Sequence, residues 1–171
     1  MHSFSIFLDF ITGKIGRAVS WLNVLLVILI CFDVGMRYFF SHTRVWIIDL
    51  EWHLFALIFL LGAAFTFQKD RHVRVDLFYH RVSEKTKAWI NLVGIVCLLI
   101  PWCLVIIWAA NKYAYNAWII KETSPDPGGM PARYIIKYAI VVGFLLLLLQ
   151  ALSTAINCML VILNRRHNVF N

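Results

Sequence analysis

The sequence predicts an all-α membrane protein: four transmembrane helices, both termini on the cytoplasmic side, and short amphipathic helices at the cytoplasmic membrane surface. Three observations predict this class. Of the 171 residues, 61% are hydrophobic and only 15% are charged, which is too little charge for a soluble domain of this length. The apolar residues fall into four long runs, each able to cross a bilayer. Basic residues cluster beside these runs. We treat 1–171 as one membrane domain.

Composition also argues against several functions. The formal net charge is +7, but the cations flank apolar runs, which indicates topology signals against anionic lipid rather than nucleic-acid binding. The four cysteines lie in apolar segments and form no Cys-x-x-Cys pair, so redox chemistry is not expected. No cleavable signal is evident, because the first apolar residues include Asp9 and lack a small-residue cleavage site.

The first half of the chain predicts a surface helix followed by a hairpin of two spans. Segment 3–16 has apolar residues at helical spacing and is interpreted as an amphipathic helix lying on the membrane. The first span covers about 18–40 and the second about 46–67. The connection between them is short, so the two spans are antiparallel. The apolar residues of the surface segment are Phe4, Phe7, Leu8, Ile11 and Ile15.

The second half predicts two longer spans. After an interfacial segment at 77–87, within which Ser83 is a candidate N-cap, the third run is clean over 88–110 and continues to 120. A helix over 88–120 would be roughly 50 Å long, well beyond a hydrocarbon core of about 30 Å. Pro101 predicts a kink, because it cannot bond the carbonyl of Cys97.

The fourth span covers about 134–163, and its Ala139 and Gly143 form a pair of small residues that permits close helix contact. Between the third and fourth spans lies the loop 121–133. Its three prolines and two glycines predict an ordered loop of tight turns rather than a helix.

The distribution of cations predicts the orientation. Ten of the 16 lysines and arginines fall on one side of the four spans and six on the other, so the first side is cytoplasmic. The ten are Lys14, Arg17, Lys69, Arg71, Arg74, Arg81, Lys85, Lys87, Arg165 and Arg166; the six are Arg37, Arg44, Lys112, Lys121, Arg133 and Lys137.

Four charged residues lie inside the first two spans, near their outer ends. Arg37 can pair with Asp33 four residues earlier on its own helix, or with Asp49 or Glu51 across the hairpin. Charges at this depth are costly unless they are paired, so we interpret the four as a structural ion-pair cluster. The alternative is an ion-coupling or proton site that uses Asp33, Arg37 and Glu51.

No catalytic, metal or cofactor site is expected. A haem subunit needs two facing histidines within the membrane, and only His53 lies inside a span. Asp49, Glu51 and His53 do not share one helix face, so they are a poor metal site. The sequence therefore indicates a membrane partner protein and not an enzyme, with a membrane-anchor subunit of a respiratory complex left as an open alternative.

Three motifs resemble the small membrane subunit of tripartite ATP-independent periplasmic (TRAP) transporters. One is Glu51 followed by Leu61–Gly62–Ala63–Ala64, and another is the cytoplasmic motif His72–Val73–Arg74–Val75–Asp76. The third is the loop with Arg133 and Lys137 after it, where Met130 replaces a usual leucine. Gln150 in the last span also fits. The loop residues of the motif are Glu122, Ser124, Pro125, Asp126, Gly128, Gly129 and Pro131.

The resemblance implies a sodium-driven importer of organic acids in the bacterial inner membrane. A periplasmic substrate-binding protein delivers the substrate, and a large membrane subunit holds the substrate and sodium sites. The small subunit would form a heterodimer with that large subunit and act as its scaffold within the lipid bilayer. The loop 121–133 would lie on the outer surface, where it contacts the binding protein, staples its two helices together, or rests on the large subunit.

Overall fold

The structure is a computed structural model that describes residues 2–41, 44–69 and 83–163, with side chains from Ser5 onward. Within these ranges every regular element is helical, and four helices are long and apolar enough to cross a membrane. The predicted all-α class with four helices able to span a membrane is therefore confirmed. The elements are α1 (His2–Phe40), α2 (Val45–Gln68), α4 (Glu84–Gly94), the π-helical turn η1 (Ile95–Leu99), α5 (Ile100–Ile119) and α6 (Tyr134–Ile162).

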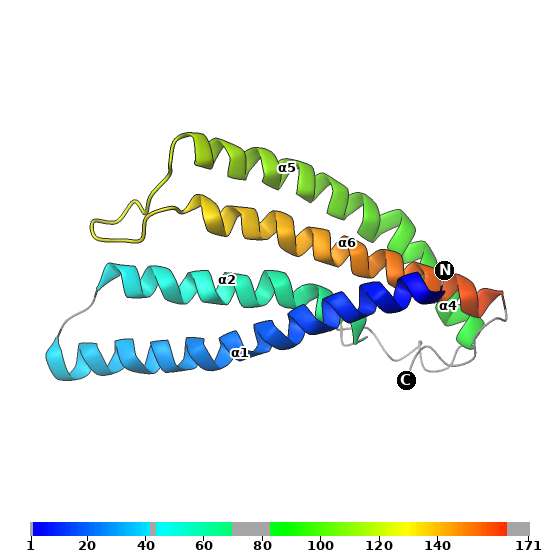
Figure 1. Ribbon diagram of the computed structural model, residues 1–171, viewed down its shortest axis with the longest axis horizontal. Coiled ribbons are helices and arrows are strands. Elements are labelled where there is room, and N and C mark those ends of the chain that lie inside the picture. Colours follow the sequence, from blue (N-terminus) through cyan, green and yellow to red (C-terminus); the bar gives the residue numbers. More distant parts are fainter. Residues whose placement is uncertain (1, 42–43, 70–82, 164–171) are drawn as a thin grey trace.

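Helix α6 is the centre of the arrangement. It contacts α1, α2, α4 and α5, and α1 also packs along α2. Figure 1 shows α5, α6, α2 and α1 side by side, with the loop 120–133 at the same end as the last turn of α1 and the first turn of α2. The N-terminal end of α1 lies beside the C-terminal end of α6. The first and last helices of the chain therefore meet.

Two glycines allow these helices to approach closely. A Cβ at Gly143 of α6 would lie 2.8 Å from the backbone oxygen of Leu60 in α2, so only hydrogen fits there. A Cβ at Gly16 of α1 would lie 2.7 Å from Cδ2 of Phe65 in α2. Of the small-residue pair predicted at Ala139 and Gly143, Gly143 therefore makes a close contact with α2, and Ala139 is buried.

Helix α1 differs from the prediction in its extent. It is continuous over 39 residues, so segment 3–16 is not a separate helix but the first part of the same one. At 1.5 Å per residue its length is about 58 Å. Ser5, Leu8 and Thr12 of this part are buried in the protein, whereas Phe7 and Phe10 are exposed. The side that faces the bundle is therefore partly polar.

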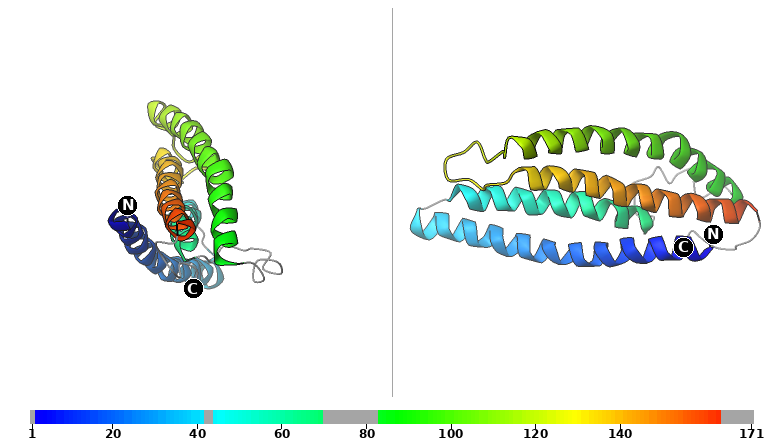
Figure 2. Two further views of the ribbon diagram at one scale, coloured as in Figure 1. Left: turned by 90° about the vertical axis from the view of Figure 1, so that its right-hand side faces the viewer. Right: turned by 45° about the horizontal axis from the view of Figure 1, so that its top comes forward.

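The third long helix runs from Glu84 through η1 to Ile119. The N-cap at Ser83 is confirmed, because its hydroxyl accepts a hydrogen bond from the Thr86 N–H at 3.3 Å. The expected distortion at Pro101 takes the form of a π turn, in which the Ile100 N–H bonds to the Ile95 carbonyl. This wider turn accommodates a residue that cannot donate a hydrogen bond. Figure 2 shows the helix bending in this region.

The predicted interfacial segment 77–87 is described only from residue 83. Residues 83–87 form the N-cap and the first turn of α4, which begins this long helix. The bend lets α4 and η1 pack against the C-terminal half of α6. There Ala88 joins Cys158 and Val161, and Ile95 joins Ala151 and Ala155.

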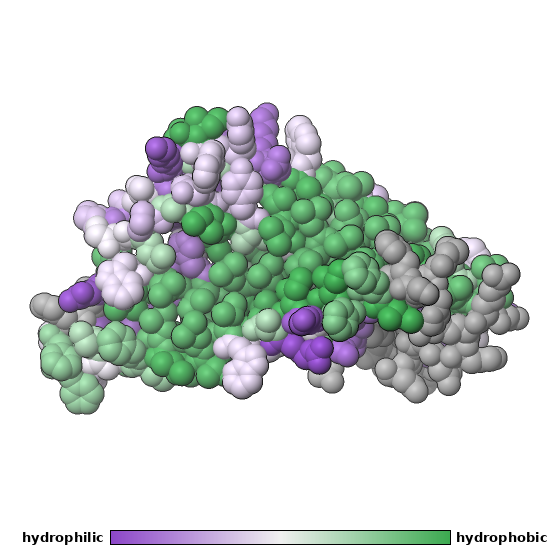
Figure 3. Space-filling view, in the orientation of Figure 1, coloured by the Kyte–Doolittle hydropathy of each residue, from purple (hydrophilic) through white to green (hydrophobic). Residues whose placement is uncertain are grey.

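The surface is divided into zones along the helices. In Figure 3 the middle of the molecule is covered by hydrophobic side chains, and hydrophilic ones gather in two places: toward the end that carries the loop 120–133, and at the lower edge nearer the opposite end. Large exposed apolar side chains occur on all the long helices, for example Trp21, Phe59, Trp108 and Ile135. Such a surface suits lipid or another membrane protein.

Candidate functional site

The predicted cluster of four charged residues divides into two groups. Arg37 pairs with Asp33 on its own helix, and its Nε donates to Asp33 Oδ2 at 2.8 Å. Asp33 is 1% exposed, while the side chain of Arg37 is half-exposed. Glu51 of α2 lies close enough to interact electrostatically with both. Asp33 Oδ1 and Glu51 Oε1 are buried without a hydrogen-bond partner among the described residues.

Asp49 belongs to a different group, which joins α2 to the loop. Its Oδ2 accepts a hydrogen bond from the Met130 N–H at 2.8 Å, and its Oδ1 accepts one from the Trp52 indole at 3.1 Å. The carboxylate is 5% exposed. We call this contact the Asp49 latch, and it ties a loop residue to a helix 81 positions earlier in the chain.

Gly129 makes the Asp49 latch sterically possible. A Cβ at this residue would lie 2.6 Å from Asp49 Oδ2 and 2.5 Å from Ser124 Cβ. A side chain at position 129 would not fit between α2 and the part of the loop around Ser124. Gly129 of the loop motif is thus required for close approach, whereas Gly128 has a φ of +81° and meets the conformational demand of the turn.

The backbone of the loop is closed by its own hydrogen bonds. Ser124 N–H bonds to the Met130 carbonyl at 3.1 Å, and Arg133 N–H bonds to the Glu122 carbonyl at 2.9 Å. Gly129 N–H bonds to the Asp126 carbonyl at 3.0 Å and forms the tip. The loop therefore has a defined shape, although Pro125, Asp126 and Pro131 are exposed.

Helix α5 ends in a motif that usually requires glycine. The Glu122 N–H bonds to the Ala117 carbonyl and the Lys121 N–H to the Trp118 carbonyl, which is the Schellman pattern. Lys121 occupies its left-handed position with a φ of +48°. A lysine there costs about 1 kcal/mol of strain. The sequence predicted that the helix extends to 120, and α5 ends at Ile119.

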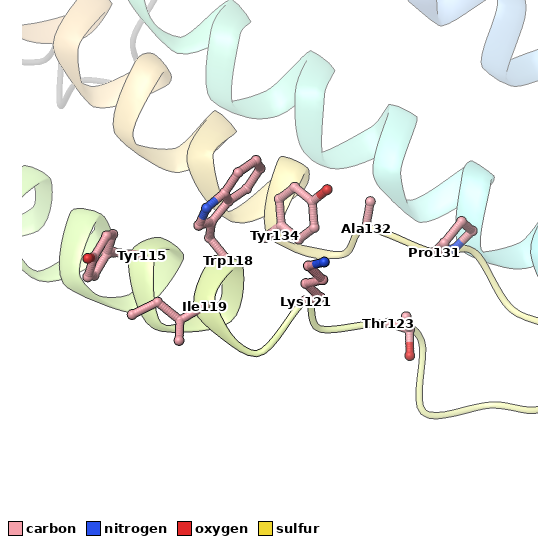
Figure 4. Close-up of a pocket in the computed structure, with 8 residues that line it drawn as sticks. All are labelled: Tyr115, Trp118, Ile119, Lys121, Thr123, Pro131, Ala132 and Tyr134. Atoms are coloured by element: carbon pink, nitrogen blue, oxygen red, sulfur yellow. The ribbon is translucent and has the colours of Figure 1, made fainter.

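Side chains connect the loop to α6 and α2, and connect α6 to α5 beside it. Lys137 of α6 forms an ion pair with Glu122, and its Nζ lies 3.9 Å from the ring centre of Tyr113 in α5. The guanidinium of Arg133 lies over the Trp52 ring of α2, 5.2 Å from its centre. In Figure 4, Trp118 and Tyr134 lie where α5 meets α6, and the two rings pack edge to face at 4.7 Å.

The loop also borders a groove of about 580 Å³ on the α5 side. Figure 4 shows its labelled residues, with Lys121 and Thr123 on the loop and aromatic side chains on the two helices. The lining residues are Tyr115, Trp118, Ile119, Lys121, Thr123, Pro131, Ala132 and Tyr134. This combination of aromatic rings and a cation is typical of a membrane–water interface.

A second polar contact, which sequence reasoning missed, lies at the opposite end of the bundle. Asp9 Oδ1 of α1 accepts hydrogen bonds from Gln150 Nε2 at 2.9 Å and from Ser153 Oγ at 2.7 Å, both on α6. The Thr12 hydroxyl donates to Gln150 Oε1 at 2.6 Å. We call this the Asp9–Gln150 network. The signal for this network in the sequence was that Asp9 and Thr12 are three residues apart and therefore lie on one side of a helix.

Several predicted features lie outside these contacts. His72, Arg74 and Asp76 of the cytoplasmic motif fall outside the described residues. His53 contacts the carbonyl of Asp49 in its own helix and stacks on Trp52. Among the described residues, no group of three or more His, Cys, Asp or Glu side chains is arranged to hold a metal ion.

The fold and these contacts define a multi-pass helical membrane protein whose buried polar side chains connect one helix or loop to another. Comparison with known families makes this specific. The family described as "Tripartite ATP-independent periplasmic transporters, DctQ component" matches residues 26–160. The chain belongs to this family, so it is the small subunit of a TRAP transporter and not an enzyme.

A curated relative agrees with this assignment. The chain is 26% identical over 99 residues to the C4-dicarboxylate TRAP transporter small permease protein DctQ of Vibrio cholerae serotype O1 (strain ATCC 39315 / El Tor Inaba N16961). The alignment covers 56% of this chain and 43% of the relative. The match therefore spans less than half of the length of that relative.

Proposed function

We propose that this small subunit is the scaffold partner of a large membrane subunit in a sodium-driven importer of organic acids in the bacterial inner membrane. A periplasmic substrate-binding protein delivers the substrate to the pair. The name of the Vibrio relative makes a C4-dicarboxylate the first substrate to test.

The observation that carries the scaffold role is how the buried polar groups are used. The Asp49 latch, the Lys137–Glu122 pair and the Asp9–Gln150 network each connect different parts of the chain, and together they fix α1, α2 and the loop to α6. A subunit that moved substrate itself would need polar groups directed at a pathway, typically at broken helices. Buried polar contacts between helices suit a subunit that stays fixed while its partner transports the substrate.

Reconstitution tests this function. The large subunit, this chain and the binding protein are placed in proteoliposomes, and uptake of a labelled C4-dicarboxylate is measured with and without an inward sodium gradient. We expect uptake only with all three proteins and the gradient. Sodium-independent uptake, or full uptake without this chain, would contradict the proposal.

The scaffold proposal includes an orientation with both termini in the cytoplasm and the loop 121–133 in the periplasm. In a cysteine-free background, Asp126→Cys should react with an impermeant maleimide from outside, and Lys85→Cys should react only after the membrane is opened. Both positions are exposed in the structure. The reverse labelling pattern would invert the orientation.

Ion coupling by Asp33, Arg37 and Glu51 is a second candidate function, favoured by one observation. Asp33 Oδ1 and Glu51 Oε1 are buried carboxylate oxygens without a hydrogen-bond partner among the described residues. Glu51→Gln separates the two roles. Normal assembly with lost sodium dependence would favour coupling, whereas unchanged sodium dependence would leave the scaffold role. A respiratory-complex anchor does not agree with the family assignment.

A further inference from the structure

Besides the groove shown in Figure 4, the loop end of the bundle contains a second groove, of about 560 Å³. It lies over α6, between α2 on one side and α5 on the other. The first two turns of α6 form its floor, the loop closes its end, and the walls come from α2 and Tyr113. Its size falls within the range of about 300–1,000 Å³ that is usual for small-molecule sites.

The groove has an apolar length and a basic end. Phe55, Phe59 and Ile140 line the part that lies deeper along the helices, and Phe55 and Phe59 are 63% and 70% exposed. Arg133, Lys137 and Glu122 line the end next to the loop. Because α6 begins directly after Arg133, this basic end lies at the edge of the apolar zone.

The charges at the basic end do not cancel. Glu122 is neutralised by Lys137, which forms an ion pair with it. Arg133 forms no ion pair within the part of the chain that the structure describes; its guanidinium lies on the Trp52 ring. One arginine charge therefore faces the groove, held in place by an aromatic surface that leaves its N–H groups available.

We propose that this groove binds one membrane phospholipid, with its phosphate at Arg133 and an acyl chain along Phe55, Phe59 and Ile140. A phosphate supplies the negative charge that the basic end lacks, and guanidinium groups bind phosphate through paired hydrogen bonds. An acyl chain suits walls of exposed phenylalanine at the depth of the hydrocarbon core. A phosphate-free amphiphile or a helix of a partner subunit would leave Arg133 without a counter-charge unless it brought a carboxylate.

The experiment uses a photoreactive benzoylphenylalanine at position 59, in the intact transporter in native membranes. After illumination, the mass of the adduct identifies the occupant. We expect a phospholipid adduct, and we expect Arg133→Gln to reduce its yield about tenfold, the loss that corresponds to one charge-assisted hydrogen bond. Arg133→Lys should retain most of the adduct. An adduct with another transporter subunit would overturn the proposal.

The matched control is Lys121→Gln. Lys121 is an exposed cation at the same end of the molecule, but it lines the other groove. Its removal should leave the yield at position 59 unchanged. Equal yields in the Arg133→Gln, Lys121→Gln and unmodified proteins would mean that lipid merely covers the surface, and this too would overturn the proposal. Co-purification with the large subunit checks that each variant is assembled.

A second measurement tests the phosphate directly. The purified, delipidated complex is titrated in native mass spectrometry with phosphatidylglycerol and, separately, with diacylglycerol of the same chains. We expect the complex to retain phosphatidylglycerol but not diacylglycerol, and Arg133→Gln to abolish the difference. Equal retention of both lipids by the unmodified complex would contradict a phosphate site.

Discussion

Asp49 and Glu51 stand two residues apart on α2, yet their carboxylates face different parts of the molecule. Asp49 faces the loop and receives hydrogen bonds from a backbone amide and an indole. Glu51 faces α1, beside Asp33 and Arg37, and one of its buried oxygens has no partner among the described residues. Residues at i and i+2 of a helix do not share a face. Both oxygens of Asp49 are thus hydrogen-bonded, whereas the side of α2 toward α1 carries unbalanced charge.

The largest effect should come from removing the Asp49 latch. Asp49→Ala leaves the Met130 and Trp52 N–H groups without their acceptor, and each buried unsatisfied group costs about 1–3 kcal/mol. We expect a loss of about 3 kcal/mol in the free energy of unfolding, measured in detergent micelles, together with protease cleavage within the loop.

Glu51→Ala is the matched control for Asp49→Ala, because it removes a carboxylate from the same helix and the same depth. It should be neutral or slightly stabilising in the isolated chain, since it deletes a buried oxygen that has no partner. Equal losses from the two variants would show that the two sides of α2 do not differ as described.

Gly129→Ala should have the next largest effect. The added methyl group would lie 2.6 Å from Asp49 Oδ2, so the loop must move away from α2 and lengthen the Met130 hydrogen bond. We expect a loss of about 2 kcal/mol, the usual size for overpacking. Gly62→Ala is the control, because a Cβ at Gly62 meets nothing within 4 Å. Identical melting temperatures for the two variants would contradict the close approach.

A smaller effect should follow from Arg37→Ala on the α1 side. The change removes the cation from Asp33, which is 1% exposed, and membrane-embedded polar contacts contribute about 1 kcal/mol. Co-purification with the large subunit should fall, and adding Asp33→Asn should restore part of it, because an unpaired buried charge costs more than an absent pair. Additive losses from the two changes would rule out an ion pair.

The smallest effect concerns the exposed tip of the loop. Asp126→Lys reverses a charge that makes no ion pair within the described residues, so the membrane subunits should assemble normally. If the tip contacts the binding protein, transport should need several-fold more binding protein to reach half its maximal rate. Glu84→Lys, at the other end of the bundle, is the control. Normal transport at limiting binding protein would exclude this contact.

The sequence predicted the bounds of α2 and α6 well, although it divided the continuous α1 into two helices. The predicted span 46–67 is one residue shorter than α2 at each end, and the predicted span 134–163 ends one residue after α6. The Ser83 cap and the distortion at Pro101 were also predictable, because a cap and a missing N–H act within one or two turns.

Contacts between distant parts were not predictable in this way. A polar stripe on a helix can face either water or polar groups of another helix, and the sequence does not distinguish the two. Asp9 and Thr12 were therefore assigned to a surface helix, although they contact α6. The partner of Asp49 is a backbone amide in the loop, and no side-chain type marks such a donor. Arg37 had three possible acceptors in the sequence, and only the relative rotation of α1 and α2 selects Asp33 among them.

The Asp9–Gln150 network has a consequence for synthesis of the protein. Its two partners are 141 residues apart, and ribosomes add about 5–20 residues per second, so Gln150 is made roughly 7 to 28 s after Asp9. During this interval the first part of α1 has no α6 to bind, and its polar side chains need water. We therefore expect this segment to stay at the membrane surface in the nascent chain, and to pack against the bundle only after α6 has been made.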